Sequence, residues 1–501
     1  MTRQQSEIAV PADTPPADTP PAELDRLLDA AVHAGRRLVS SRPTDRAGWL
    51  ELIADRLDAA GHLVPLAERE THLGSDRLKG ELKRTTFQLR LFAEVLRDGA
   101  FLQATVDHAD PAWPMGARPD LRRMLRPVGP VAVYAASNFP FAFSVAGGDT
   151  AAAIAAGCPV LLKVNPGHPE LSSATGAQVV QALRDAGAPD GIFAVVSGLQ
   201  TGIALVQDPR IRAASFTGSL RGGRALFDLA VSRPDPIPFF GELGSVNPAF
   251  VTPEAAARRA DEVAIGFVGS VTLGNGQFCT KPGLLFVPAG SGLEDRISDL
   301  ASGRSGTPML SEHIRSGYAD ALAFLAGRPG VRVLAGAAET AGDPAPTILA
   351  TTVPELLADA NALTAECFGP AALVVSYGST EELLAGARVL HGQLTATVQS
   401  VDGAEEPVVP ALLDALAERV GRVVWNGWPT GVSVSYAQQH GGPYPATTTV
   451  QTTSVGTAAI DRFLRPVTYQ DAPVGVLPPA LQEDNPWRLP RRVDGVQRLQ
   501  A

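Results

Sequence analysis

The sequence predicts an α/β protein with two doubly wound αβα lobes. Its 501 residues exceed what one hydrophobic core usually serves, so at least two lobes are expected. From Val131 onward, short β-rich runs alternate with helical stretches, which is typical of a parallel sheet with helices on both faces. A second series of the same kind begins after Glu242, and we place the boundary between the lobes there.

The first half of the chain contains a helical layer and then the first αβ series. Residues 1–22 are rich in Pro, Ala, Asp and Thr and are predicted to form a flexible tail, with no signal peptide. Residues 23–98 have apolar residues at helical spacing. Strands are then predicted at 131–136, 159–164, 193–197, 214–217, 238–240 and 248–251. The segment 141–162 has the length of a membrane span, but Asp149, Pro159 and its glycines predict a buried helix followed by a strand.

The second half repeats the pattern and ends in an irregular tail. A helix is predicted at 254–271, and strands at 284–288, 372–377, 395–400 and 422–427. The stretch from Pro466 is rich in Pro and polar residues but keeps large apolar side chains. We expect it to wrap a surface of its own chain or of a neighbouring subunit.

The net charge and the cysteine content indicate which partners and which kinds of site are unfavourable. The net charge is -10 and no Lys/Arg-rich block occurs, so nucleic acids and anionic membranes are poor partners, and a small molecule is favoured. The three cysteines, Cys158, Cys279 and Cys367, are too few for a disulfide framework, and no Cys/His cluster has metal-ligand spacing. A protein of the reducing cytoplasm without a bound metal is expected.

Cys279 in GNGQFCTKPG is the best candidate nucleophile. A thiol attacks as the thiolate, so it needs access to the substrate and a suitable pKa, and the flanking glycines permit a tight, exposed loop. The alternative is a buried small apolar residue. Glu242, at the end of a predicted strand in an apolar setting, is a candidate general base, or else a structural carboxylate. Asn138, after the strand 131–136, is a candidate oxyanion donor, or else a turn residue.

A dinucleotide site is indicated without the usual fingerprint, because no GxGxxG follows a strand. In FTGSLRGG, a strand leads into Gly218 and Ser219 and then into a helix, whose N-terminus could bind a pyrophosphate. Lys163 ends a strand one βα unit earlier, where it could reach a ribose or phosphate. Glu366 in AECFGPA could accept from ribose hydroxyls. Each of these residues alone also has a purely structural explanation.

Taken together and in order, SNFPF, LLK, FTGS, ELGS, GQFCT and ECFGP resemble the aldehyde dehydrogenase superfamily from about residue 23 onward. Within it, GELGSVNPAF, PTGVSVSYAQQHGGPYPATT and the C-terminal tail resemble the branch of α-ketoglutaric semialdehyde dehydrogenases and NADP-dependent long-chain aldehyde dehydrogenases. The resemblance implies an NAD(P)-binding domain at 23–241 with oligomerisation strands inserted at 107–124. It further implies a catalytic domain at 242–430 and a C-terminal return to the cofactor lobe and oligomerisation tail at 431–501.

The resemblance also assigns roles to single residues. It implies that Cys279 forms a thiohemiacetal and then a thioester, that Asn138 holds the oxyanion, and that Glu242 activates the hydrolytic water. For the cofactor it implies Lys163, Gly218, Ser219, Glu366 and Phe368. A homodimer or homotetramer is implied in the same way.

Cofactor and substrate choice remain open at this point. Pro166 stands where the NAD-preferring pattern has a glutamate that repels a 2′-phosphate, so NADP is permitted, but no arginine in 198–206 demands it. Cys367 replaces a more usual aliphatic residue, and we predict a packing role. The candidate walls of the substrate pocket suit an apolar aldehyde: Phe139, Phe143, Phe278 and Trp428.

A semialdehyde with a second carboxyl group would instead need a cation, for which Arg122, Arg123 or Lys281 are the options. The segment 440–449 is expected either to border the substrate mouth or to form a structural turn. A thiol esterase, or an inactive homologue that only binds, are the remaining alternatives. The cofactor motifs argue against the first, and the intact Cys279, Glu242 and Asn138 argue against the second.

Overall fold

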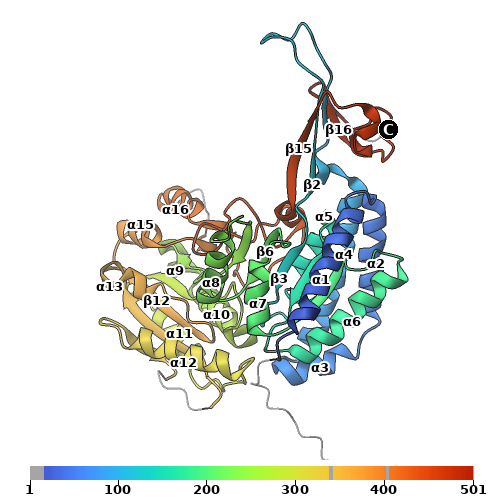
Figure 1. Ribbon diagram of the computed structural model, residues 1–501. Helices are drawn as coiled ribbons and strands as arrows, with labels where there is room; N and C mark the ends of the chain where they lie inside the picture. The colour runs from blue at the N-terminus through green and yellow to red at the C-terminus, as the bar shows by residue number, and fades with distance from the viewer. Residues whose placement is uncertain (1–15, 338–341, 402–405, 500–501) are drawn as a thin grey trace, which may run out of the picture.

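The computed structural model describes residues 16–337, 342–401 and 406–499. Its body has two lobes, and a narrow β extension projects from the body (Figure 1). Each lobe contains its own largely parallel sheet, with separate hydrophobic clusters on the two faces. The predicted α/β class with two doubly wound lobes is therefore confirmed. Among the described residues, no helix has both the length and the apolar character that a membrane span requires.

Four helices form the predicted N-terminal layer over 23–98: α1 (Pro21–Leu38), α2 (Pro43–Asp58), α3 (Leu63–Thr71) and α4 (Ser75–Asp98). The end of the predicted flexible tail is fixed to the body. The Thr19 amide donates to Ser197 O at 3.0 Å, and Asp18 Oδ1 accepts from the Thr201 amide at 2.9 Å. Flexibility is therefore the wrong prediction for this part of the tail, because its backbone and side chains are hydrogen-bonded; residues 1–15 lie outside the described residues.

The first sheet has the strand order β5-β4-β3-β6-β7 and is parallel throughout. Its strands are β3 (Val131–Tyr134), β4 (Val160–Lys163), β5 (Phe193–Val196), β6 (Ala213–Thr217) and β7 (Phe239–Glu242). Its crossover helices are α5 (Gly148–Ala156), α6 (Pro169–Asp185), α7 (Leu199–Gln207) and α8 (Leu220–Val231). Alternate residues of β3 enter different clusters, Val131 and Val133 on one face and Ala132 and Tyr134 on the other.

The order of this sheet reverses between β3 and β6, since the chain builds outward from β3 to β5 and then returns to β6. In sheets of this kind, ligands bind outside the carboxyl ends of the strands at that reversal. Asn138 follows β3, Gly218 follows β6 and Glu242 ends β7, so all three lie at the same edge.

The second sheet has the order β10-β11-β12-β9-β8-β13-β14, parallel except for β10. Its strands are β8 (Ala249–Val251), β9 (Leu284–Pro288), β10 (Arg332–Ala335), β11 (Thr347–Thr352), β12 (Ala371–Tyr377), β13 (Gln393–Gln399) and β14 (Val420–Trp425). Its helices include α9 (Pro253–Arg258), α10 (Ala260–Thr272), α11 (Leu293–Ala301), α12 (Glu312–Ala326), α13 (Val353–Ala358), α14 (Ala360–Leu363), α15 (Thr380–Val389) and α16 (Val408–Ala417). The sequence prediction missed β10 and β11 at the edge of the sheet.

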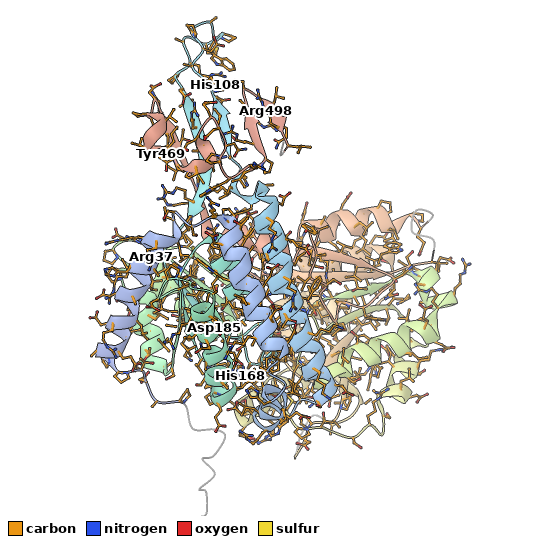
Figure 2. The ribbon with its side chains drawn as sticks, turned by 90° about the vertical axis from the view of Figure 1, so that its right-hand side faces the viewer. Arg37, His108, His168, Asp185, Tyr469 and Arg498 are labelled. Carbon is orange, nitrogen blue, oxygen red and sulfur yellow. The ribbon has the colours of Figure 1, made fainter. Side chains whose placement is uncertain are left out.

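The extension joins segments that are far apart in the chain. Its strands are β1 (Thr105–Asp107), β2 (Leu121–Pro127), β15 (Leu464–Gln470), β16 (Arg491–Val493) and β17 (Val496–Arg498), in the order β15-β2-β1-β16-β17. Figure 2 shows His108, Tyr469 and Arg498 on it, well away from His168 in the first lobe. His108, which follows β1, links this part of the extension to the C-terminal part. Its Nδ1 is 2.6 Å from Asp494 Oδ2, and its Nε2 is 3.1 Å from Glu483 Oε1.

Candidate active site

Cys279 lies in the turn between the short 3₁₀ helix η2 (Leu273–Gly276) and β9, and it is partly exposed. The turn depends on Gly276, whose φ is 66°, because a Cβ there would lie 2.1 Å from the carbonyl oxygen of Gly369. Cys158 and Cys367 are both buried. Cys279 is therefore the cysteine that a substrate can reach.

Glu242 and His440 lie directly beside this thiol. Glu242 is the last residue of β7 and is 3% exposed, and His440 is 0% exposed. His440 Nε2 is 3.0 Å from Glu242 Oε1 and 3.6 Å from Cys279 Sγ, and Ser454 Oγ donates to Glu242 Oε2 at 2.5 Å. Because a carboxylate only accepts, Nε2 is the nitrogen that carries the proton in this arrangement.

Sequence reasoning missed His440, although the segment 440–449 was considered either as a border of the substrate mouth or as a structural turn. The backbone of this segment is tied to the end of β7, where the Leu243 amide donates to Ala446 O at 2.8 Å and Thr447 forms a bridge with Glu242. This pairing places the His440 ring beside the Glu242 carboxylate. The possible signal was a histidine followed by two glycines, since glycines permit close approach of the backbone.

The electrostatics of the cluster keep the acid charged and the thiol protonated. Burial opposes ionisation of Glu242, but the charge and hydrogen bond of His440 and the hydroxyl of Ser454 hold its pKa below the ordinary value. Burial and the negative charge of Glu242 raise the pKa of Cys279 well above its ordinary value. The thiol therefore needs a proton acceptor next to it, and Glu242 is an ionised one.

The same three donors could also bind a soft divalent cation. The Glu242 carboxylate, the Cys279 sulfur and a His440 ring nitrogen all lie within 4.8 Å of one another. Thiolate, imidazole and carboxylate are a usual set for zinc. The sequence predicted no metal site because these residues are far apart in the chain, and the direct hydrogen bond between His440 and Glu242 favours proton chemistry here.

Asn138 follows β3 and is 7% exposed. Its Nδ2 donates to Gln277 O, two residues before the nucleophile, at 3.1 Å. An amide nitrogen carries two protons, so one remains for an oxyanion. Arg77 Nη2 donates to Asn138 O at 2.7 Å and fixes the backbone of this turn.

Three of the four predicted pocket walls form one aromatic cluster. The Phe139 ring centroid is 5.4 Å from that of Phe143 and 5.2 Å from that of Phe278, and Phe143 lies 6.3 Å from the ring of His440. Trp428 is not brought to this cluster. Its indole packs on α10 instead, 5.8 Å from Phe267, because Gly266 leaves room for it.

None of the three cations considered from sequence lies free at this pocket. Arg122 is in the extension and binds Asp120, Glu483 and Leu481 O, and Arg123 is its neighbour on β2. Lys281 is 4% exposed and donates to the backbone carbonyls of Cys367 and Ala371.

Three other arginines lie here instead. Arg77 is 5.1 Å from the Phe139 centroid and 4.8 Å from that of Phe278, and Arg84 is 5.2 Å from that of Phe143. Arg422 binds the nearby loop at Pro429 O and Gly431 O.

The predicted phosphate-binding residues lie at the carboxyl edge of the first sheet. Gly218 and Ser219 are exposed at the start of α8, where Ser219 Oγ caps the helix by accepting from the Gly222 amide at 3.2 Å. A Cβ at Gly218 would lie 2.7 Å from the Phe216 ring, so backbone rather than side chain faces a ligand here. Lys163 ends β4 and is partly buried, and burial lowers its pKa. This edge fits a dinucleotide pyrophosphate and ribose.

Glu366 and Phe368 lie at the lobe junction. A Cβ at position 244 would lie 2.6 Å from Glu366 Oε2. Only a glycine at this position therefore lets the Glu366 carboxylate approach the end of β7. Burial raises the pKa of Glu366 to about 7. Phe368 is partly exposed beside it. Cys367 is 6% exposed within the core of the second lobe, which agrees with the packing role predicted for it.

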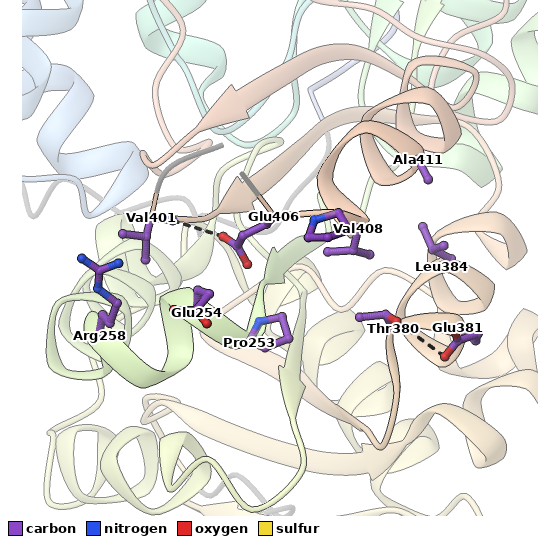
Figure 3. A pocket seen from close by; sticks show the side chains of 11 residues that line it. Pro253, Glu254, Arg258, Thr380, Glu381, Leu384, Val401, Glu406, Val408 and Ala411 are labelled. Atoms are coloured by element: carbon purple, nitrogen blue, oxygen red, sulfur yellow. Dashed lines mark hydrogen bonds between the residues drawn. The ribbon is translucent and has the colours of Figure 1, made fainter. Parts of the chain in front are cut away.

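A large hollow of about 640 Å³ lies elsewhere, between α9, α15 and α16 (Figure 3). Glu254, Arg258 and Glu381 lie at its rim, and Glu406 accepts from the Val401 amide at 3.4 Å within it. The described residues that line it include no cysteine. Its size alone does not make it the active site.

The chain is similar to known proteins over most of its length. The profile of the aldehyde dehydrogenase family matches residues 12–465. An α-ketoglutaric semialdehyde dehydrogenase 2 of Azospirillum brasilense is 45% identical over 90% of this chain and 87% of its own. An α-ketoglutaric semialdehyde dehydrogenase of Acinetobacter baylyi is 42% identical over 95% of this chain and 91% of its own.

Solved structures share the fold at lower identity. Aldehyde dehydrogenase 21 of Physcomitrella patens, in complex with the reaction product succinate, has a TM-score of 0.76 and 21% identity, covering 92% of each chain. A 3,6-anhydro-L-galactose dehydrogenase in complex with NAP has a TM-score of 0.77 and 20% identity, covering 90% of this chain and 92% of its own.

Proposed function

The chain belongs to the aldehyde dehydrogenase family and is an NAD(P)-dependent oxidoreductase, and we propose that it oxidises α-ketoglutaric semialdehyde (2,5-dioxopentanoate) to 2-oxoglutarate. The observation that supports the chemistry is that Glu242 lies beside the Cys279 thiol, while Asn138 binds the backbone two residues before it. The substrate is taken from two relatives that are 45% and 42% identical over nearly the whole chain.

In the first half-reaction, Cys279 Sγ bonds to the aldehyde carbon while its proton passes to Glu242 and on to solvent. The aldehyde oxygen becomes an oxyanion that accepts from Asn138 Nδ2, giving a thiohemiacetal. Bound NAD(P)⁺ would supply the acceptor for the hydride of this carbon, and Cys279 would then hold the acyl group as a thioester.

In the second half-reaction, Glu242 takes a proton from a water molecule that attacks the thioester carbonyl. The carbon–sulfur bond then breaks, and the carboxylic acid and the free thiol are released. The hydrogen bonds from His440 and Ser454 favour the ionised form of Glu242. The carboxylate is therefore ready as a base at neutral pH.

For the cofactor, Gly218 and Ser219 would hold the pyrophosphate and Lys163 the adenosine ribose. Glu366 would bind the nicotinamide ribose, with Phe368 beside it. We propose that both NAD and NADP are used, with NADP slightly preferred, because Pro166 replaces a residue type that would repel the 2′-phosphate.

A medium- or long-chain aliphatic aldehyde is the second candidate substrate. The cluster of Phe139, Phe143 and Phe278 would suit an apolar chain. Substrate ranking by the purified enzyme separates the two.

We further propose a cytoplasmic homodimer or homotetramer. The extension exposes Val474, Val476 and Val496, and the edge strand β14 exposes Val423 and Trp425. Apolar side chains at a sheet edge favour pairing with another chain. The three free thiols suit a reducing compartment. Light scattering after size exclusion tests the assembly, and a monomer would contradict it.

The enzymatic proposal is tested by NAD(P)H formation with 2,5-dioxopentanoate, succinic semialdehyde, hexanal and decanal, each with NAD and NADP. We expect the highest kcat/KM for 2,5-dioxopentanoate, and we expect the Cys279→Ala variant to lose this activity. Higher kcat/KM for decanal would favour the aliphatic substrate, and no turnover by the folded protein would contradict both.

A further inference from the structure

Two of the arginines near the candidate pocket come from different lobes and meet at one loop. Arg84 lies on α4, and Arg422 lies on β14 of the second sheet. Arg84 Nη2 donates to Val432 O at 3.4 Å, while Arg422 Nη2 and Nη1 donate to Pro429 O at 2.7 Å and Gly431 O at 3.2 Å. The loop 429–432 therefore brings both guanidinium groups to the same side of the pocket.

Each of these two side chains keeps a buried N–H without a partner. Arg84 Nη1 and Arg422 Nε are buried and donate to no partner among the described residues. A buried donor that is left unpaired is costly, and a charged one more so. A bound ligand that accepts from these donors would remove that cost.

The charge around them is only partly balanced. Burial lowers the pKa of both arginines. The negative charges of Glu81 and Glu242 raise the pKa of Arg84, and negative charge on Cys279 raises the pKa of both arginines. Glu81 Oε1 accepts from the amides of Phe141 and Ala142, while its Oε2 is buried without a partner among the described residues. The carboxylates of Glu81 and Glu242 therefore balance part of the positive charge of these arginines.

Arg77 also has a buried nitrogen without a partner among the described residues, its Nη1, but it differs from the other two arginines in its surroundings. It is held between the Phe139 and Phe278 rings, and its Nη1 would lie 2.7 Å from a Cβ at Gly274. Its other nitrogen binds Asn138 O. Arg77 therefore acts as a positioning residue for the oxyanion turn, and it offers a matched contrast to Arg84 and Arg422.

We infer that Arg84 and Arg422 bind the carboxylate end of a short acidic aldehyde and so make the enzyme specific for semialdehydes of dicarboxylic acids. This inference rests on the proposed function and deepens it. The 2-keto acid end of 2,5-dioxopentanoate presents neighbouring oxygens that only accept, and guanidinium groups present matching donors. An unbranched alkanal would leave both donors unpaired.

The test compares three substrates of five carbons. 2,5-Dioxopentanoate has the carboxylate and the keto group, 5-oxopentanoate has the carboxylate alone, and pentanal has neither. In Arg84→Met and Arg422→Met, we expect kcat/KM for the two acids to fall roughly 10²-fold, mainly through KM, while that for pentanal stays the same or rises.

Two variants serve as controls. Arg90→Met, on the same helix but paired with Asp55 and Asp58 at the surface, should leave all three rates unchanged. Arg77→Met should lower kcat for all three substrates alike, because it disturbs the turn of Asn138.

A binding measurement provides a second readout. In the wild type, 2-oxoglutarate should slow the alkylation of Cys279 by iodoacetamide, and this protection should be lost in Arg84→Met and Arg422→Met. Equal loss of activity on acids and pentanal, with protection retained, would overturn the role of the arginines. A wild type that turns over pentanal as well as the acids would instead refute the proposed substrate.

Discussion

His440 Nε2 donates to Glu242 Oε1 at 3.0 Å, across 198 residues of chain, and both side chains are buried. The contact fixes which oxygen of the carboxylate is occupied by a donor. It also places an imidazole 3.6 Å from the thiol of Cys279. His440 is thus a positioning residue for the base that the chemistry needs.

Replacing His440 by Phe should shift the acid limb of the rate profile to higher pH. His440 holds the pKa of Glu242 below its ordinary value, so without it burial dominates and the pKa rises. More of Glu242 is then protonated near neutral pH, and kcat falls there. The kcat–pH profile measures the shift, and His440→Gln, whose amide can still donate, should restore most of it. An unshifted profile in His440→Phe would contradict this role.

Replacing Glu242 by Gln should make Cys279 more reactive toward alkylation while it abolishes turnover. The charge of Glu242, together with burial, raises the pKa of Cys279. Removing the charge lowers that pKa, so a larger fraction of Cys279 is thiolate at neutral pH. The rate of iodoacetamide labelling at neutral pH checks this. Glu262→Gln, at an exposed ion pair on α10, is the control; slower labelling in Glu242→Gln would contradict the assignment.

Asn138→Ala should lower kcat by roughly 10²- to 10³-fold with a smaller change in KM. The remaining proton of Nδ2 is expected to bind the oxyanion only as it forms. The variant also loses the hydrogen bond to Gln277 O, so its melting temperature should be measured alongside. A stable variant that loses less than about tenfold in kcat would exclude Asn138 as a major donor.

The local motifs made much of the site predictable. Cys279, Glu242 and Asn138 each belong to a short segment whose strand or glycines set its position, and alternating β-rich and helical runs gave the two sheets. The edge strand β10 and its neighbour β11 were missed. At positions 332–335 the strand is only partly buried, so the apolar signal is weak.

Contacts between residues that are far apart in the chain could not be predicted from the sequence. His440 meets Cys279 over 161 residues, and Arg84 meets the loop at Val432 over 348. Neither carries a local pattern that marks it as functional. The cations expected from sequence were wrong for a related reason: Arg122 and Lys281 have suitable charge, but folding pairs them with other partners. Trp428 likewise packs on α10.

Glu366 should make cofactor binding depend on pH. Burial raises its pKa to about 7, so the carboxylate that would accept from ribose hydroxyls is present above that pH and is protonated below it. The KM for NAD(P) should therefore rise as the pH falls below about 7. In Glu366→Gln, KM should be higher and nearly independent of pH. Initial rates over a range of cofactor concentrations at each pH measure this.

The same carboxyl group also affects stability, and the sign can be worked out. Its pKa is raised in the folded state, so between the ordinary value of 4.5 and about 7 the folded protein binds a proton that the unfolded chain has released. The free energy of unfolding therefore falls as the pH rises through this window. Glu366→Gln should flatten that slope in urea unfolding. A pH-dependent KM that persists in Glu366→Gln would show that another group titrates, and an unchanged slope in urea would contradict the raised pKa.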